Sequence, residues 1–134
     1  MPRVMATAAC LLLLAFPASA QDAVGAADVG PNAARDFWCA SAFGVASANA
    51  AESGDGIESI SLRESMATLF QRLLLEMQAG GYSREQYDVL ASDYLRRVLD
   101  PFRDAEDGFS RAQCENAVTE ATAFLSEVPV PGGN

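Results

Sequence analysis

Histidine and lysine are both absent from this 134-residue sequence, and their absence removes most familiar catalytic schemes. A serine nucleophile needs a histidine or lysine base, a Schiff base needs a lysine amine, and many metal sites need imidazole. The side chains that remain for chemistry are carboxylates and thiols, from 18 Asp and Glu residues and 3 Cys residues. Catalysis would therefore depend on a pair of carboxylates or on a free cysteine.

Glu76 is the best single candidate for a catalytic carboxylate, because its neighbours in the sequence are apolar. Residues 73–75 are all leucine and Met77 follows. Such surroundings can keep a carboxylic acid protonated, as the hydrolysis of a glycosidic bond by a pair of Asp or Glu residues requires. The alternative, which we favour, is that Glu76 lies on the polar face of a helix beside Arg72.

The acidic stretch 104–108, followed by Glu115, is similar to part of a calcium-binding loop. With Asp104 at position 1 of an EF-hand loop, Glu115 falls at position 12 as required, but Gly108 falls at position 5 instead of 6. Moving the frame to correct the glycine places Arg103 first and Cys114 last. Neither register supplies the full ligand set, so we predict no metal site here.

Two further motifs have a structural explanation that we prefer to a functional one. Met66 and Met77 could ligate a soft metal or haem, but both fall on the apolar stripe of one predicted helix, where methionine usually packs. Arg96 and Arg97 could grip an anionic ligand, but Asp93 precedes Arg97 by four residues, the spacing of a surface ion pair on a helix. We therefore predict no cofactor.

The first twenty residues have the organisation of a cleavable secretory signal peptide. Arg3 is followed by an uncharged run at residues 4–16, and Ala18 and Ala20 form the small-residue pattern that signal peptidase accepts. The apolar run is shorter than the roughly 20 residues that span a bilayer. We therefore expect cleavage between Ala20 and Gln21, with the mature protein in the periplasm or outside the cell and no membrane span left after cleavage.

The three cysteines divide between the predicted signal peptide and the mature chain. Cys10 precedes the leucine run at residues 11–14 instead of following the apolar segment, so it does not match the lipid-modified cysteine of a lipoprotein. Cys39 and Cys114 remain after cleavage, and they have no metal-site spacing. An exported protein folds where disulfides persist. The sequence therefore predicts a Cys39–Cys114 disulfide, which would also remove thiol catalysis.

Three serines are predicted to cap helices in the mature chain. Ser61, Ser83 and Ser110 each begin a Ser-x-x-Glu or Ser-x-x-Gln pattern, in which the serine oxygen accepts from one free backbone N–H and the third residue reaches back to another. Each pattern precedes apolar residues at helical spacing. A further helix is expected from about Pro31 to the turn at residues 53–56, with an apolar stripe and many Ala, Ser and Gly residues that would let another helix approach closely.

These elements predict an all-α fold: a four-helix bundle-like single domain with one disulfide linking the first and fourth helices. Removal of 20 residues from 134 leaves 114, enough for one domain. The expected organisation is a signal peptide at 1–20, a flexible lead-in at 21–30, the helical domain at 31–128 and a disordered tail at 129–134.

The predicted mature chain is strongly acidic. It keeps all 18 acidic residues and 8 of the 9 arginines, so its formal charge is 8 − 18 = −10. Such a chain is repelled by phosphate backbones and anionic lipid headgroups, which argues against nucleic acid and membrane surfaces as partners. Cationic partners are favoured electrostatically, although acidity also serves solubility.

A short aromatic and cysteine motif provides one family resemblance. Phe37, Trp38 and Cys39, followed by Phe43, resemble the first helix of HdeA-type periplasmic acid-stress chaperones, over about seven residues. The resemblance implies a small helical protein with one disulfide that exposes apolar faces on acidification. Below about pH 3 the carboxylates would be mostly neutral, leaving the arginine charges to repel one another.

From these observations we expect a non-enzymatic, exported helical protein that binds another envelope or secreted protein. The acid-stress chaperone is the alternative supplied by the resemblance. A third hypothesis is a small-ligand carrier or carboxylate enzyme that uses a pocket between helices; an apolar cavity would favour it and a solid core would oppose it.

Overall fold

The computed structural model describes residues 24–101 and 108–129. Its elements are the short helix α2 (Ala26–Val29) and four long helices, α3 (Ala33–Glu52), α4 (Gly56–Ala79), α5 (Arg84–Leu99) and α6 (Arg111–Glu127). The part of the chain that is described contains no strand. The all-α fold with four main helices is therefore confirmed.

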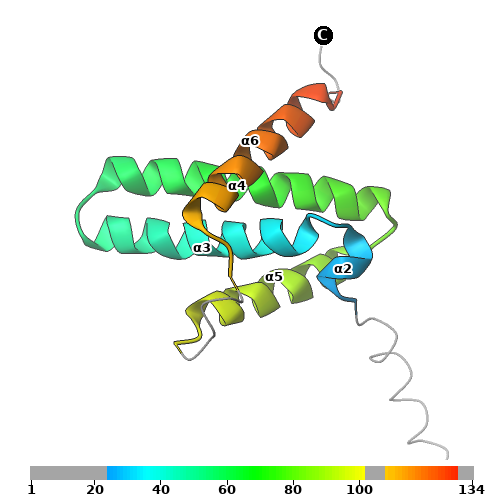
Figure 1. The fold of residues 1–134 in the computed structure, drawn as a ribbon, viewed down its shortest axis with the longest axis horizontal. Coiled ribbons are helices and arrows are strands. Elements are labelled where there is room, and N and C mark those ends of the chain that lie inside the picture. The colour runs from blue at the N-terminus through cyan, green and yellow to red at the C-terminus, as the bar shows by residue number, and fades with distance from the viewer. Residues whose placement is uncertain (1–23, 102–107, 130–134) are drawn as a thin grey trace, which may run out of the picture.

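Helices α3 and α4 form a long antiparallel hairpin that is the centre of the molecule (Figure 1). Two buried serines join them, because the Ser47 hydroxyl donates to the Ser59 carbonyl at 2.8 Å and the Ser59 hydroxyl donates to the Ser47 carbonyl at 2.9 Å. Gly44 lies at the same contact, where a Cβ would come within 2.9 Å of the Met66 sulfur and the Met66 side chain would have to shift. The small side chains of α3 thus accept α4, as the composition predicted.

Helix α5 lies beside α3 and is held there by aromatic rings. The Phe37 ring of α3 stacks on Tyr94 with centroids 5.5 Å apart and meets Tyr87 at 5.9 Å. Leu90 completes the buried face of α5. The contact of α5 with α3 is more extensive than its contact with α4.

Helix α6 crosses the hairpin on another side and packs against α4 and α3 (Figure 1). Its buried residues are all small: Cys114, Ala117 and Ala121. The predicted disulfide is present, with Cys39 and Cys114 bonded and their Cα atoms 5.2 Å apart. It links the first and fourth of the long helices, as predicted.

The predicted caps at Ser83 and Ser110 are confirmed, since each hydroxyl accepts from the backbone N–H three residues later at 3.1 Å. The prediction that Ser61 caps the second helix is wrong. That helix begins five residues earlier, at Gly56, where the Asp55 carboxylate accepts from the Glu58 backbone N–H at 3.0 Å. Ser61 is an exposed residue inside α4, where its pattern has no capping role.

The lead-in before the domain has more structure than the sequence suggested. Residues 26–29 form one helical turn, and Ala26 is buried. The Tyr82 hydroxyl donates to the Asp28 carbonyl at 2.9 Å, which ties this turn to the α4–α5 connection. Tertiary contact supplies the order that the local composition lacks. Residues 21–23 and 130–134 of the expected lead-in and tail lie outside the described residues.

Candidate functional site

The disulfide removes the thiols from the set of reactive groups. Cys39 is fully buried and Cys114 is nearly so. The bond between them closes a sequence interval of 75 residues. Neither sulfur is a free nucleophile or a thiolate ligand in this oxidised form.

Glu76 is in the ion pair that we favoured over a catalytic role. Its carboxylate accepts from Arg72 Nε at 2.9 Å. The side chain is about one quarter exposed. It is not the isolated acid in an apolar pocket that glycoside hydrolysis would require.

Glu76 and Arg72 belong to an ion cluster that joins three helices. Arg35 of α3 donates to Glu120 of α6 at 2.6 Å and lies 3.0 Å from Asp36. Arg72 Nη1 of α4 lies 3.8 Å from the second Asp36 oxygen, and neither of these two atoms has a hydrogen bond among the described residues. The cluster cross-links α3, α4 and α6.

Asp36 is the buried member of this ion cluster. It is fully inaccessible, and burial raises its pKa despite the opposing effect of Arg35 beside it. A carboxylate that solvent cannot reach cannot meet a substrate without movement of the helices. Asp36 therefore serves the fold. The helical spacing indicates the burial of Asp36, because the residue follows Ala33 by three positions and precedes Ala40 by four on the buried face of α3.

The calcium-loop prediction falls mostly outside the described residues. Residues 104–107 are not described, and Glu115 is paired with Arg111 at 3.0 Å. Gly108 lies against the ring of Trp38, where a Cβ could not fit. Within residues 24–101 and 108–129, no group of three potential metal ligands comes together.

The methionines and the arginine pair have the structural roles that we preferred. Met77 is buried in the core, and Met66 is half-buried against Gly44. Arg97 pairs with Asp93 at 2.7 Å, and its guanidinium lies 4.6 Å from the centre of the Tyr94 ring. Arg96 also pairs with Asp93, at 3.4 Å, so both arginines take part in surface ion pairs.

The predicted cleavage site, between Ala20 and Gln21, lies outside the described residues, as does Cys10. Among the helices that are described, none is both long enough and apolar enough to cross a membrane.

An apolar groove with a volume of about 420 Å³ lies between α3, α4 and α5. This is within the range of roughly 300–1,000 Å³ found for ligand pockets. Its floor comes from α3, one wall from α4 and the other wall from α5. The lining residues are, in that order, Ser41, Gly44, Val45 and Ala48; Met66 and Phe70; Ala91, Ser92 and Leu95.

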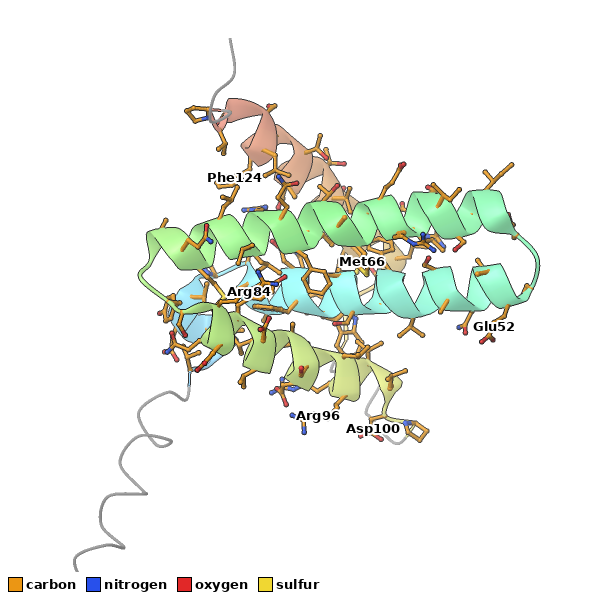
Figure 2. All side chains as sticks on the ribbon, turned by 180° about the vertical axis from the view of Figure 1, so that it is seen from behind. Glu52, Met66, Arg84, Arg96, Asp100 and Phe124 are labelled. Atoms are coloured by element: carbon orange, nitrogen blue, oxygen red, sulfur yellow. A yellow bond between two sulfur atoms is a disulfide. The ribbon has the colours of Figure 1, made fainter. Side chains whose placement is uncertain are left out.

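The groove exists because α5 diverges from the hairpin. In Figure 2 the Arg84 end of α5 lies close to α3, whereas the Asp100 end lies away from it, and Figure 1 shows the same divergence. The aromatic contacts of Phe37 with Tyr87 and Tyr94 hold one face of α5 against α3. Beside them, small side chains of α3 leave a gap next to α5: Ser41, Gly44 and Ala48.

Ser41 gives the groove a polar feature at its floor. The residue is 4% exposed, and its hydroxyl oxygen has no hydrogen-bond partner among the described residues. A buried hydroxyl without a partner costs about 1–3 kcal/mol. The sequence had placed Ser41 among the small residues of its helix but did not single it out.

A second depression, of about 370 Å³, lies at the end of the hairpin near α2 and the last turn of α6. Its lining includes Glu76 and Phe124. Glu76 is already paired with Arg72, whose guanidinium also lies 5.4 Å from the centre of the Phe124 ring. Its only charged group is therefore occupied. A third depression, of about 490 Å³, is lined by Asp88, Val89, Ser92 and Arg96 of α5 alone. We take the apolar groove as the candidate site because three helices form it.

Comparison with protein-family models, with curated proteins and with solved structures gives no match to this chain. The resemblance of the Phe37–Trp38–Cys39 motif to HdeA-type chaperones therefore stays a hypothesis. In the structure these three residues are buried at the contact of α3 with its neighbours.

Proposed function

We propose that this protein is an exported, non-enzymatic binding protein whose binding site is the apolar groove between α3, α4 and α5. The observation that carries the proposal is the groove: an open cavity of about 420 Å³ with walls from three helices. A well-formed apolar cavity with few polar groups is the default location of a binding site in a small domain.

The chemistry of the lining favours binding over catalysis. Ser41 and Ser92 are the only lining residues with polar side chains. The chain has no histidine or lysine that could activate a serine, and the ion cluster of Asp36 is made by other residues. The groove therefore offers apolar contact and one buried hydroxyl.

The expected compartment is the periplasm or the outside of the cell. The support is the signal-peptide pattern that ends at Ala20. The Cys39–Cys114 disulfide is compatible with an oxidising compartment. In that setting the expected partner is another envelope or secreted protein.

The proposal is tested with an uncharged fluorescent dye, N-phenyl-1-naphthylamine, titrated into the mature protein. We expect saturable fluorescence enhancement with one dye per chain. Ala48→Phe should lower the dye affinity at least about tenfold, because the ring fills the groove. Ala48 is exposed on its helix, so the substitution leaves the core intact.

The matched control is Ala123→Phe, which adds the same ring at an exposed alanine of α6, away from the groove. It should leave dye binding unchanged. No saturable binding, or an equal loss in both variants, would contradict the proposal.

A further inference from the structure

The groove lies where a neighbouring helix is missing from the bundle. Helix α5 packs mainly on α3 and less on α4, so an open channel runs between α4 and α5 with α3 as its floor. From Ser41 to Ala48 the floor covers about 10 Å, or two helical turns. The small side chains there would allow another helix to approach to the usual separation of about 8–10 Å.

Helix α6 cannot supply that missing helix, because the disulfide holds it elsewhere. Cys39 precedes Ala48 by nine residues in α3, which places the two side chains roughly 180° apart around the helix axis. The cysteine pins α6 on the side of α3 opposite the groove. Among residues 24–101 and 108–129, no helix therefore covers this channel.

Exposed leucines extend one wall of the groove beyond the cavity. Leu95 lines the groove and is 42% exposed, and Leu99, four residues later on the same face of α5, is 57% exposed. A small apolar molecule that fills the cavity would leave Leu99 uncovered. An amphipathic helix, whose apolar side chains recur at i, i+3, i+4 and i+7, would cover both leucines and the floor.

The charges beside the groove and the net charge of the chain indicate which residue type the outward face of such a helix carries. Glu52 follows Ala48 by four residues and Arg63 precedes Met66 by three, and neither has an ion pair within the described residues. These two opposite charges at the open end nearly cancel. The net charge of the predicted mature chain, 8 − 18 = −10, then decides the long-range field and favours a cationic partner.

We infer that the groove binds an amphipathic helix of a partner protein, with its apolar face against Ala48 and Leu95 and basic residues on its outward face. The inference rests on the proposed function, because it names the occupant of the same groove.

The probes are two synthetic helical peptides of about 18 residues, with the same leucine stripe and the same outward-facing hydrocarbon staple. One carries arginine and the other glutamate on the outward face. We expect the arginine peptide to bind, with amide shift changes at Gly44, Ala48 and Ala91 in NMR spectra. The glutamate peptide should bind at least about tenfold more weakly, and the difference should shrink with added salt.

Two variants test whether the peptide occupies the groove. Ala48→Phe should weaken binding of the arginine peptide at least about tenfold, and Leu95→Ala should weaken it roughly fivefold to tenfold through lost apolar contact. The control Ala123→Phe should leave the affinity unchanged. Unchanged affinity in both variants would show non-specific attraction to the acidic surface and would overturn the inference, as would an equal loss in the control.

Other outcomes separate this inference from the proposed function. If the dye binds in the groove and neither peptide does, the helical occupant is wrong and the binding function stands. If neither dye nor peptide binds, both fail. Equal binding of the two peptides would overturn the basic partner. A dimer in sedimentation that Ala48→Phe dissociates would identify a second copy of this chain as the occupant and also overturn it.

Discussion

Reduction of the Cys39–Cys114 disulfide should release α6 before the rest of the domain unfolds. Besides Cys114, the buried residues of α6 are Ala117 and Ala121, which bury little apolar area. Its ion pairs with other helices, Arg35 and Arg72 with Glu120 and Arg111 with Glu58, have partly exposed partners and add little. The disulfide is thus the main restraint on this helix.

The free energy that the disulfide contributes follows from the length of chain that the bond closes. For global unfolding the interval is 75 residues, and the chain-entropy model gives about 4.5 kcal/mol. When α6 alone opens, the interval is the roughly 15 residues from Leu99 to Cys114, for which the model gives about 3 kcal/mol, within the typical measured range of 2–4 kcal/mol. Each 1.4 kcal/mol is a factor of about ten in an equilibrium constant. Loss of the bond should therefore raise the population of the α6-open state roughly 30- to 1,000-fold.

The assay is amide hydrogen exchange of the oxidised protein, the reduced protein and a Cys39→Ala/Cys114→Ala double variant. We expect α6 amides to exchange faster by that factor after reduction, while the amides of α4 keep more of their protection. If α4 and α6 lose protection together, the helices open only by global unfolding and the reasoning is refuted. Unchanged protection of α6 would refute it equally.

Three further predictions concern the fold and the chain terminus. Gly108→Ala should lower the free energy of unfolding by about 1–3 kcal/mol in urea titrations, because the added Cβ meets the ring of Trp38 and backbone must move. Burial raises the pKa of Asp36 in the folded state above its ordinary value of 3.8, so wild type should gain stability relative to Asp36→Asn as the pH falls. The gain should be complete below about pH 3.8 and lost as the pH rises through the folded pKa. Urea titrations from pH 3 to 8 that show the opposite trend would contradict this. Intact-mass measurement of the exported protein should show Gln21, intact or cyclised, at the N-terminus, and a chain that begins at Met1 would contradict cleavage after Ala20.

Much of the secondary structure could be predicted because its causes are local. The caps at Ser83 and Ser110 depend on residues three positions apart, and both are present in the structure. The same pattern at Ser61 was misleading, because Ser-x-x-Glu also occurs inside helices. The true start of α4 depends on Asp55 after the turn at Gly54, whose φ of 85° suits glycine.

The ion cluster and the groove could not be predicted in the same way. Asp36 meets Arg72, and Arg35 meets Glu120, only when three helices converge, and no local pattern pairs residues so far apart in the chain. Likewise, the contact of Gly108 with Trp38 joins a connecting segment to a helix 70 residues earlier.

By itself, the sequence determined the helical class, most helix ends, the disulfide pair and the lack of histidine and lysine chemistry, because residue type, spacing and count are sufficient for each. Only the tertiary structure decided on which side of α3 each neighbouring helix lies. The aromatic contacts of Phe37 direct α5, and Cys39 directs α6 to the opposite side from Ala48. The groove is open because α5 and α6 pack on different sides of α3. These positions depend on packing between segments that are distant in the chain.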